Sequence, residues 1–223
     1  MTLTELKKIV CEQNQRLPGS GLVIVTEGNV SQISSDRRYF VIKPSGVEYG
    51  KLTHAHMVVM DLDGNIVDGE MRPSVDTPTH LEIYRRYPHI GGITHTHSSF
   101  ATIFAQMKKP IPCYGTTHAD AFYDEVPVTR HLTDEEIMND LEFNTARVIA
   151  EILDRRIAPC VLVASHGPFT FGKDAKEAVN HAAIVEQVAM MAILGQYESP
   201  VQKALIEKHF QRKHGKGHYY GQT

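Results

Sequence analysis

The segment Gly91-Gly92-Ile93-Thr94-His95-Thr96-His97-Ser98 carries two histidines that are separated by one residue. Side chains two positions apart on a strand point to the same face, so His95 and His97 are spaced roughly 6.5–7 Å apart along the backbone. Two imidazoles in this arrangement can bind a single metal ion. The same pair also suits a purely structural role, with one histidine at the edge of the core and the other on the surface. The pair alone is therefore weak support for a metal site.

Two further residues are candidate metal ligands. His166 follows an apolar run and precedes Gly167-Pro168, which predicts a position on a loop at the rim of the fold. Asp76 precedes Thr77-Pro78, so it is either an oxygen ligand or the N-cap of a helix. Three imidazoles with an open fourth position are typical of a catalytic zinc site, and a carboxylate can fill or leave that position. Spacing by itself does not bring these residues together.

Three short segments are rich in small residues that carry hydrogen-bond donors. They are Gly28-Asn29-Val30-Ser31, Lys43-Pro44-Ser45-Gly46 and Pro73-Ser74-Val75-Asp76. Backbone amides, serine hydroxyls, an asparagine amide and a lysine ammonium suit a dianionic phosphate. The third segment also precedes a predicted helix, whose dipole favours an anion. None of the three matches a nucleotide-binding glycine motif. Taken singly, each is more simply explained as an ordinary turn.

The elements around these residues predict an α/β fold with a central, mostly antiparallel sheet flanked by helices. Apolar positions at helical spacing indicate an N-terminal helix that ends at Pro18-Gly19, and Asp63-Gly64-Asn65 indicates a hairpin turn. A long segment rich in Pro, Gly, Thr and His, 110–133, is expected to be mostly a functional loop. The predicted strands are 22–26, 30–34, 39–43, 57–61, 66–67, 92–97 and 160–164. The other predicted helices are 76–87, 98–106, 133–153, 173–194 and 200–212.

The bulk properties exclude several classes of protein. A length of 223 residues suits one domain over 1–223, and a formal net charge of -3 does not point to nucleic acid. No apolar run approaches the roughly 20 residues that a membrane-spanning helix needs, and the N-terminus does not have the pattern of a signal peptide. The three cysteines are widely scattered, which favours reduced thiols and a cytoplasmic location.

The chain resembles the class II aldolase/adducin-like family, and within it the L-ribulose-5-phosphate 4-epimerases, in seven segments. In order these are GNVS, KPSG, PSVDTPTH, GGITHTHS, GTTHADAFY, SHGPF and HYYGQ. The resemblance runs from the first helix to the last few residues, and seven ordered motifs are far more specific than one histidine pair. It implies a class II aldolase-like fold, a phosphorylated pentulose substrate and a cytoplasmic homotetramer with active sites shared between subunits.

The resemblance also assigns roles to individual residues. It implies that a metal ion, zinc with manganese or cobalt as alternatives, is bound by Asp76, His95, His97 and His166. It implies substrate and phosphate contacts at Gly28, Asn29, Lys43, Ser45, Gly46, Ser74 and Val75. Asp120 matches the catalytic acid/base, with Thr116 as an accessory group. Tyr220 matches a second acid/base and His209 a further contributor, and both are expected to come from a neighbouring subunit. Val75 departs from the family pattern, which has a second serine there.

The expected reaction converts L-ribulose 5-phosphate into D-xylulose 5-phosphate, a step on which several routes of carbohydrate catabolism, such as that of arabinose, converge. The hydrogen on C4 is not next to the carbonyl, so inversion requires retro-aldol cleavage of C3–C4 and re-addition. The chain offers no obvious Schiff-base lysine, which favours a metal as the Lewis acid. Two alternatives remain open. A related aldolase of the L-fuculose-phosphate type is expected to have Glu in place of Asp76, and a non-catalytic adducin-like structural protein is expected to lack some of the metal histidines.

Overall fold

The computed structural model describes residues 1–195 and 197–216. In this part of the chain, seven strands form one sheet in the order β4-β3-β2-β1-β5-β7-β6, and all neighbouring pairs are antiparallel. The sheet therefore matches the predicted class II aldolase-like α/β architecture. Its strands are β1 (Asn29–Ile33), β2 (Tyr39–Ile42), β3 (Val58–Asp61), β4 (Ile66–Asp68), β5 (Gly92–His95), β6 (Cys160–Leu162) and β7 (Pro168–Gly172).

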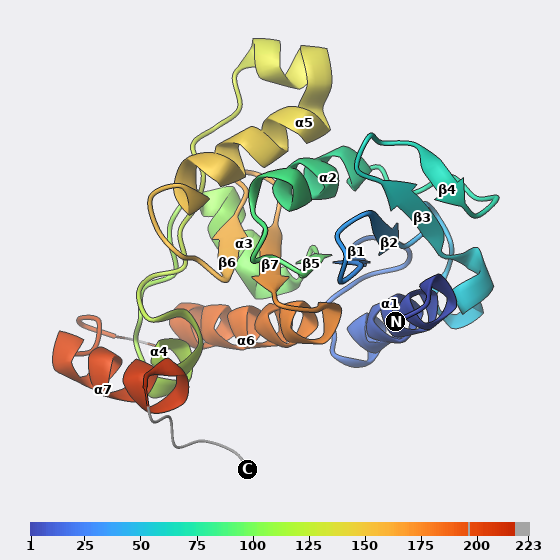
Figure 1. Cartoon of the computed structure of the whole chain (residues 1–223). Coiled ribbons are helices and arrows are strands. Elements are labelled where there is room, and N and C mark those ends of the chain that lie inside the picture. The colour runs from blue at the N-terminus through green and yellow to red at the C-terminus, as the bar shows by residue number, and fades with distance from the viewer. Residues whose placement is uncertain (196, 217–223) are drawn as a thin grey trace.

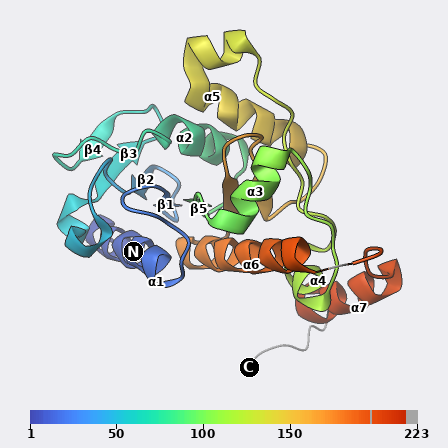
Figure 2. The same cartoon turned by 180° about the vertical axis from the view of Figure 1, so that it is seen from behind.

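Helices cover both faces of the sheet (Figure 1). α2 and α5 lie above it in that view, and α1 and α6 lie below it. Figure 2, seen from behind, shows α3 in front of the sheet, where it packs on α6. No described helix has the length and apolar character that crossing a membrane requires. The helices are α1 (Leu3–Gly19), α2 (Thr77–Arg86), α3 (Ser99–Met107), α4 (Thr116–Phe122), α5 (Asp134–Leu153), α6 (Ala175–Leu194) and α7 (Lys203–His214), with short 3-10 turns η1 (Tyr49–Lys51) and η2 (His54–His56).

The alternation of apolar residues along the strands places side chains on both faces of the sheet. On β2, Phe40 and Ile42 pack under α2 and α5, whereas Val41 between them packs against α1. On β3, Val58 and Met60 likewise face α2 and α5. All five side chains are at most 4% exposed. Because successive side chains on a strand point to opposite faces, these short apolar runs serve two core layers at once.

Local signals set the helix ends. α1 begins with a capping box at Thr2, whose hydroxyl accepts from Glu5 N while the Glu5 carboxylate accepts from Thr2 N. Thr133 makes the same box at the start of α5. α5 contains one non-helical residue, Asp140, with φ −160° and ψ 89°, so its first turns project away from the rest of the fold.

One sequence-based expectation about an element is wrong, and two elements were not predicted. Residues 22–26 do not form a strand, because Glu27 N bonds to Ile24 O in a turn, Val25 has φ 55° and its side chain is 77% exposed. The 110–133 segment is mostly loop, as expected, but it also contains the helix α4. β7 was not predicted, although its Pro-Phe-Thr-Phe-Gly sequence pairs with both β5 and β6. β7 is needed for the site, because it supplies the neighbours of His95.

Candidate functional site

Three histidines from two distant parts of the chain meet in the structure. His95 ends β5, His97 follows two residues later, and His166 lies in the loop between β6 and β7. One ligand nitrogen from each of the three lies within 4.8 Å of the others. The Nε2 atoms of His95 and His97 are 3.0 Å apart. Three imidazole nitrogens this close suit a single ion with metal–nitrogen bonds near 2 Å, so the donor set fits a divalent metal.

His95 is the most constrained of the three. It stands opposite Asn29 of β1 and opposite Phe169 of β7, and its ring stacks on Phe169 with the centroids 4.1 Å apart. Its Nδ1 lies 3.1 Å from the carbonyl oxygen of Pro168. A carbonyl can only accept, so Nδ1 carries the proton and Nε2 is left with its lone pair. Burial lowers the pKa of His95 to about 3, against the opposing effect of Asp76, so the ring is neutral and able to bind a metal.

The β6–β7 hairpin carries His166 to the other two rings. Val163 N donates to Gly167 O at 2.9 Å, and Ser165 takes a positive φ of 64° to close the loop. Gly167 allows the close approach, because a Cβ there would lie 2.6 Å from Thr96 O, next to His97. This explains on local grounds why glycine follows His166. The ring centroid of His166 lies 4.6 Å from that of His95 and 5.0 Å from that of His97.

Asp76 stands at the N-cap position of α2, but its side chain makes no capping hydrogen bond. Its Oδ2 instead accepts from Asn29 Nδ2 at 2.6 Å. Burial raises the pKa of the Asp76 carboxyl. The nearby His95, His80 and His166 and the Asn29 amide together lower this pKa by more than burial raises it, so the net shift is downward. The carboxylate is therefore ionised and faces the histidines. It lies outside the close set of three nitrogens and lines the same cleft.

A buried polar network, which the sequence did not point to, lies behind this carboxylate. Ser31 Oγ is 2.7 Å from His80 Nδ1 and 2.7 Å from the hydroxyl of Tyr84. His80 and Ser31 are fully buried, and the Nε2 atom of His80 has no hydrogen-bond partner among the described residues. His80 lies one helical turn after Asp76, on the same face of α2. That i, i+4 spacing in Asp-Thr-Pro-Thr-His was the only available sequence signal.

The predicted phosphate-binding segments are held together by backbone hydrogen bonds. Ser74 N donates to Lys43 O at 3.0 Å, and Ser45 N donates to Arg72 O at 2.9 Å. These two amides are therefore not free for a phosphate, so the expected phosphate contacts of Ser45 and Ser74 fall to their hydroxyl groups. The Ser74 hydroxyl accepts from Asn29 Nδ2 at 3.0 Å. Side chains and the remaining amides of these segments are what the cleft offers to a ligand.

Lys43 is a buried cation in this cleft. Only 2% of the residue is exposed, and its Nζ donates to two carbonyl oxygens, those of Thr26 at 3.1 Å and Pro44 at 3.4 Å. Among the described residues, no carboxylate lies within ion-pair distance of Nζ. An ammonium has three protons to donate, so one is left beyond the two carbonyls, and Nζ also lies 4.9 Å from the centre of the Tyr49 ring. Burial lowers the pKa of Lys43 to about 8, so the side chain still carries its charge at neutral pH.

The histidines, Asp76 and the three segments share one cleft of about 280 Å³. Gly28 is constrained there, because its φ is 76° and a Cβ would lie 2.8 Å from His95 O. Val75 is 66% exposed at the rim. Glu27, which sequence reasoning missed, also lines the cleft. The complete lining is Thr26, Glu27, Gly28, Asn29, Lys43, Ser45, Gly46, Ser74, Val75, Asp76, His95, His97 and His166.

The proposed acid/base residues that the structure describes lie away from this cleft in the fold. Asp120 and the exposed Thr116 belong to α4, which packs against α7 at the end of α6 away from β1 (Figure 1). His209 Nδ1 of α7 is 3.0 Å from Asp120 Oδ1, and Arg212 Nη2 is 3.6 Å from the same oxygen.

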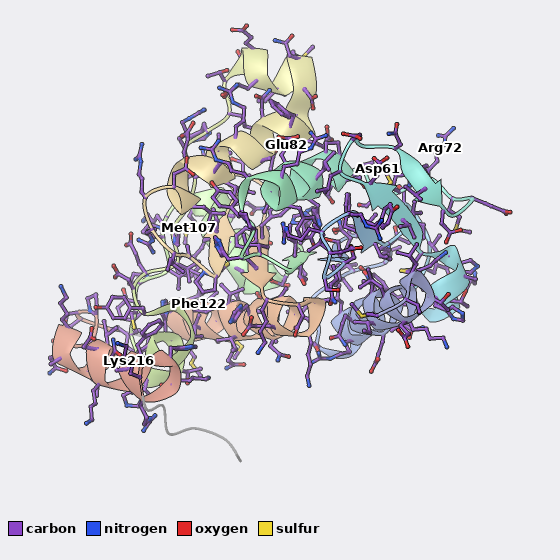
Figure 3. All side chains as sticks on the ribbon, viewed as in Figure 1. Asp61, Arg72, Glu82, Met107, Phe122 and Lys216 are labelled. Atoms are coloured by element: carbon purple, nitrogen blue, oxygen red, sulfur yellow. The ribbon has the colours of Figure 1, made fainter. Side chains whose placement is uncertain are left out.

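None of these side chains lines the cleft of its own chain, which corrects the expectation that Asp120 would. Figure 3 shows the separation: Phe122 of α4 and Lys216 after α7 lie at one end of the molecule, and Arg72, near the cleft, lies at the other. Tyr220 falls outside the described residues.

Comparison with known proteins gives consistent matches over most of the chain. A family model described as "Class II Aldolase and Adducin N-terminal domain" matches residues 8–193. Among solved structures, an L-fuculose 1-phosphate aldolase is 26% identical, with a TM-score of 0.80 over 93% of this chain and 95% of that chain.

Two further structures share the fold at lower identity. YgbL from Klebsiella pneumoniae is 22% identical, with a TM-score of 0.76 over 93% of this chain and 99% of that chain. An L-fuculose-1-phosphate aldolase from Thermus thermophilus is 23% identical, with a TM-score of 0.67 over 86% of this chain and 93% of that chain.

Proposed function

Because the chain belongs to the family of class II aldolase and adducin N-terminal domains, we propose that it is a metal-dependent enzyme that converts L-ribulose 5-phosphate into D-xylulose 5-phosphate. The observation that carries this proposal is that three histidine nitrogens, a carboxylate and a buried ammonium share one cleft. The structural similarity to an L-fuculose 1-phosphate aldolase supports a sugar phosphate as the substrate.

Inversion at C4 requires a bond to be broken and remade. A base takes the proton of the C4 hydroxyl, the O–H electron pair forms the C4 carbonyl, and the C3–C4 electron pair stays on C3 as an enediolate. The aldehyde fragment, glycolaldehyde phosphate, rotates and presents its other face. The C3 electron pair then attacks C4, and the new C4 oxygen takes up a proton. Atoms and electrons balance without any further reactant.

The donor set of the cleft fits a divalent cation, with His95, His97 and His166 as ligands and Asp76 as the proposed fourth. Such a cation supplies the positive charge that stabilises electrons left next to the substrate carbonyl. Imidazole and carboxylate ligands accept zinc, manganese or cobalt. Asp76 is already ionised and oriented by Asn29. It needs no deprotonation before it can bind.

The buried ammonium of Lys43 is proposed to anchor the phosphate of the substrate. Its remaining proton and its positive charge suit a phosphate oxygen. A phosphate fixed in this way keeps the aldehyde fragment in the cleft while its carbonyl turns. Effective capture of both fragments is what separates an epimerase from an aldolase, which releases them.

We propose that Asp120 and Tyr220 transfer the protons at the C4 oxygen, one on each face of the aldehyde. His209 is in contact with Asp120 and is proposed to assist it. Because Asp120 lies outside the cleft of its own chain, it would serve the cleft of a neighbouring subunit, together with His209, Thr116 and Tyr220. A cyclic homotetramer has the head-to-tail interfaces that such sharing requires.

An aldolase acting on a ketose 1-phosphate is the second candidate, and the 26% identity to an L-fuculose 1-phosphate aldolase favours it. Asp76 is the residue that weighs against it, because the resemblance to class II aldolases leads us to expect Glu at that position. The two candidates make different products. The aldolase releases a free aldehyde, and the epimerase does not.

A coupled assay tests the proposal. Purified protein is given L-ribulose 5-phosphate, and D-xylulose 5-phosphate is detected with and without a chelator. We expect turnover that the chelator abolishes and added zinc restores, and no turnover in His166→Ala. His54→Ala, an exposed histidine away from the cleft, is the matched control. Free aldehyde from L-fuculose 1-phosphate, without any product from L-ribulose 5-phosphate, would establish the aldolase instead.

A further inference from the structure

Glu27 places a carboxylate beside one of the three histidines. Its backbone is fixed by its neighbours, since Glu27 N donates to Ile24 O at 3.1 Å and the hydroxyl of Tyr49 lies 2.7 Å from Glu27 O. Its side chain lines the cleft and is 55% exposed. The Glu27 Oε2 atom lies 3.5 Å from Nδ1 of His97. This is ion-pair distance in the metal-free arrangement, slightly longer than a hydrogen bond.

The two nitrogens of His97 face different partners. Nε2 points toward Nε2 of His95, 3.0 Å away, whereas Nδ1 lies on the opposite edge of the ring toward Glu27. A neutral imidazole that gives the lone pair of one nitrogen to a metal carries its proton on the other. The proton of a metal-bound His97 is therefore on Nδ1 and directed at Glu27.

His97 depends on such a partner more than His95 does. β5 ends at His95, so His97 lies beyond the strand ladder, and a third of its side chain is exposed. His95 is buried, stacked on Phe169 and bonded to the Pro168 carbonyl. Among the described residues, Glu27 is the only carboxylate within ion-pair distance of Nδ1 of His97. In the part of the chain that the structure describes, no backbone carbonyl bonds to Nδ1 of His97 as Pro168 does to Nδ1 of His95.

We propose that Glu27 is a positioning residue that accepts the Nδ1 proton of His97 and holds Nε2 toward His95 and His166. The proposal rests on the metal centre described under the proposed function. A carboxylate in this place fixes both the tautomer and the orientation of the ring, and loss of such outer partners typically lowers metal affinity about 10- to 100-fold. Because Glu27 is half exposed, we expect an effect at the lower end of that range.

Zinc affinity of the full chain, measured by competition with a chromophoric chelator, provides the first test. We expect Glu27→Ala to weaken zinc binding roughly 10-fold and Glu27→Gln, whose amide oxygen still accepts, to weaken it less. Glu48→Gln is the matched control, since Glu48 is an exposed glutamate on a neighbouring turn and is paired with Lys51. Thermal unfolding of the metal-free proteins should be nearly the same for all variants, because the Glu27 side chain is 55% exposed and outside the buried core.

Nitrogen NMR of the His97 ring in the zinc-loaded protein provides the second test. We expect the Nδ1–H signal to shift in Glu27→Ala, with the His95 and His166 signals unchanged. Unchanged zinc affinity together with unchanged His97 signals in Glu27→Ala would overturn the proposal. A cobalt-loaded Glu27→Gln variant whose visible spectrum shows a changed coordination number would also overturn it, because Glu27 would then be a direct ligand. If wild-type protein binds no zinc at all, the proposed metal-dependent function fails instead.

Discussion

Asn29 and His95 stand directly opposite each other in β1 and β5, and the side-chain amide of Asn29 donates to Asp76 Oδ2 at 2.6 Å. The ladder that positions the imidazole therefore also positions the donor that orients the carboxylate. Two chemically different candidate metal ligands, one on a strand and one at the start of a helix, are aligned by a single pair in the sheet. A slip of one residue between β1 and β5 would leave the side chains of Asn29 and His95 on opposite faces of the sheet.

Replacing Asn29 with leucine should loosen this arrangement while keeping the size of the side chain. Asn29→Leu removes a hydrogen bond that favours the ionised form, so we expect the pKa of the Asp76 carboxyl to rise in the metal-free protein. Carbon NMR of the Asp76 carboxyl group during a pH titration measures this pKa. Asn65→Leu, which removes a similar bond to Asp61 in an exposed turn, should leave the pKa of Asp76 unchanged. An unaltered Asp76 titration in Asn29→Leu would contradict the assigned contact.

Phosphate binding should depend on the charge of Lys43. Burial lowers the pKa of Lys43 to about 8, so the free protein loses this charge as the pH rises through that value. We expect the affinity for inorganic phosphate, measured by calorimetry, to fall above pH ~8. Lys43→Met should weaken phosphate binding roughly 10-fold or more at pH 7, because a hydrogen bond to a charged group contributes about 1.5–3 kcal/mol. In this variant the fall in phosphate affinity above pH ~8 should also disappear. Lys51→Met, at an exposed lysine, should behave like the wild type.

Acid should destabilise the protein partly through His80. Burial lowers the pKa of His80 to about 4, against the opposing effect of Asp76, whereas an unfolded histidine has a pKa near 6.5. The unfolded state then binds more protons than the folded state between these values, so stability is full above pH ~6.5 and is lost as the pH falls toward ~4.

The metal-free wild type should lose about 3 kcal/mol more than His80→Gln over this range in urea unfolding, since one pKa unit corresponds to about 1.4 kcal/mol. His54→Gln should follow the wild type, because His54 is exposed. Parallel pH profiles for the wild type and His80→Gln would show that His80 does not resist protonation in the fold.

Mixed oligomers should reveal which residues act in the cleft of their own subunit and which act in the cleft of a neighbouring subunit. A cleft variant, His95→Ala, and an Asp120→Asn variant are each expected to lack epimerase turnover. If Asp120 acts on the cleft of a neighbour, co-refolded equal mixtures should recover roughly a quarter of wild-type activity, since half of the clefts are intact and half of those meet an intact neighbour.

A mixture of Asp120→Asn and Tyr220→Phe should recover no epimerase activity, because the same neighbouring subunit is proposed to supply both residues to a cleft. Recovery in that second mixture, or none in the first, would contradict the proposed sharing. Zinc content separates the roles further. Asp120→Asn should bind zinc like the wild type, because Asp120 lies outside the cleft of its own chain.

The sequence by itself determined the local elements and the residue types for the chemistry. Capping residues, turn signals and apolar periodicity are properties of neighbouring residues, so most strands and helices were predicted close to their observed bounds. The hairpin at Asp63-Gly64-Asn65 is one example, since β3 and β4 pair around it. The close set of His95, His97 and His166 could be suggested from seven ordered motifs, because a familiar pattern already carries information about spatial proximity.

Only the tertiary structure decided how those residues are used. Asp76 occupies an N-cap position and yet turns its carboxylate to Asn29, 47 residues away along the chain. The amides of Ser45 and Ser74 donate to backbone carbonyl oxygens. Asp120 pairs with His209, 89 residues away, rather than entering the cleft. Each of these outcomes depends on strand pairing and helix packing between distant segments. Sequence spacing contains no measure of such distances, so the partners of Glu27, His80 and Lys43 became visible only in the folded chain.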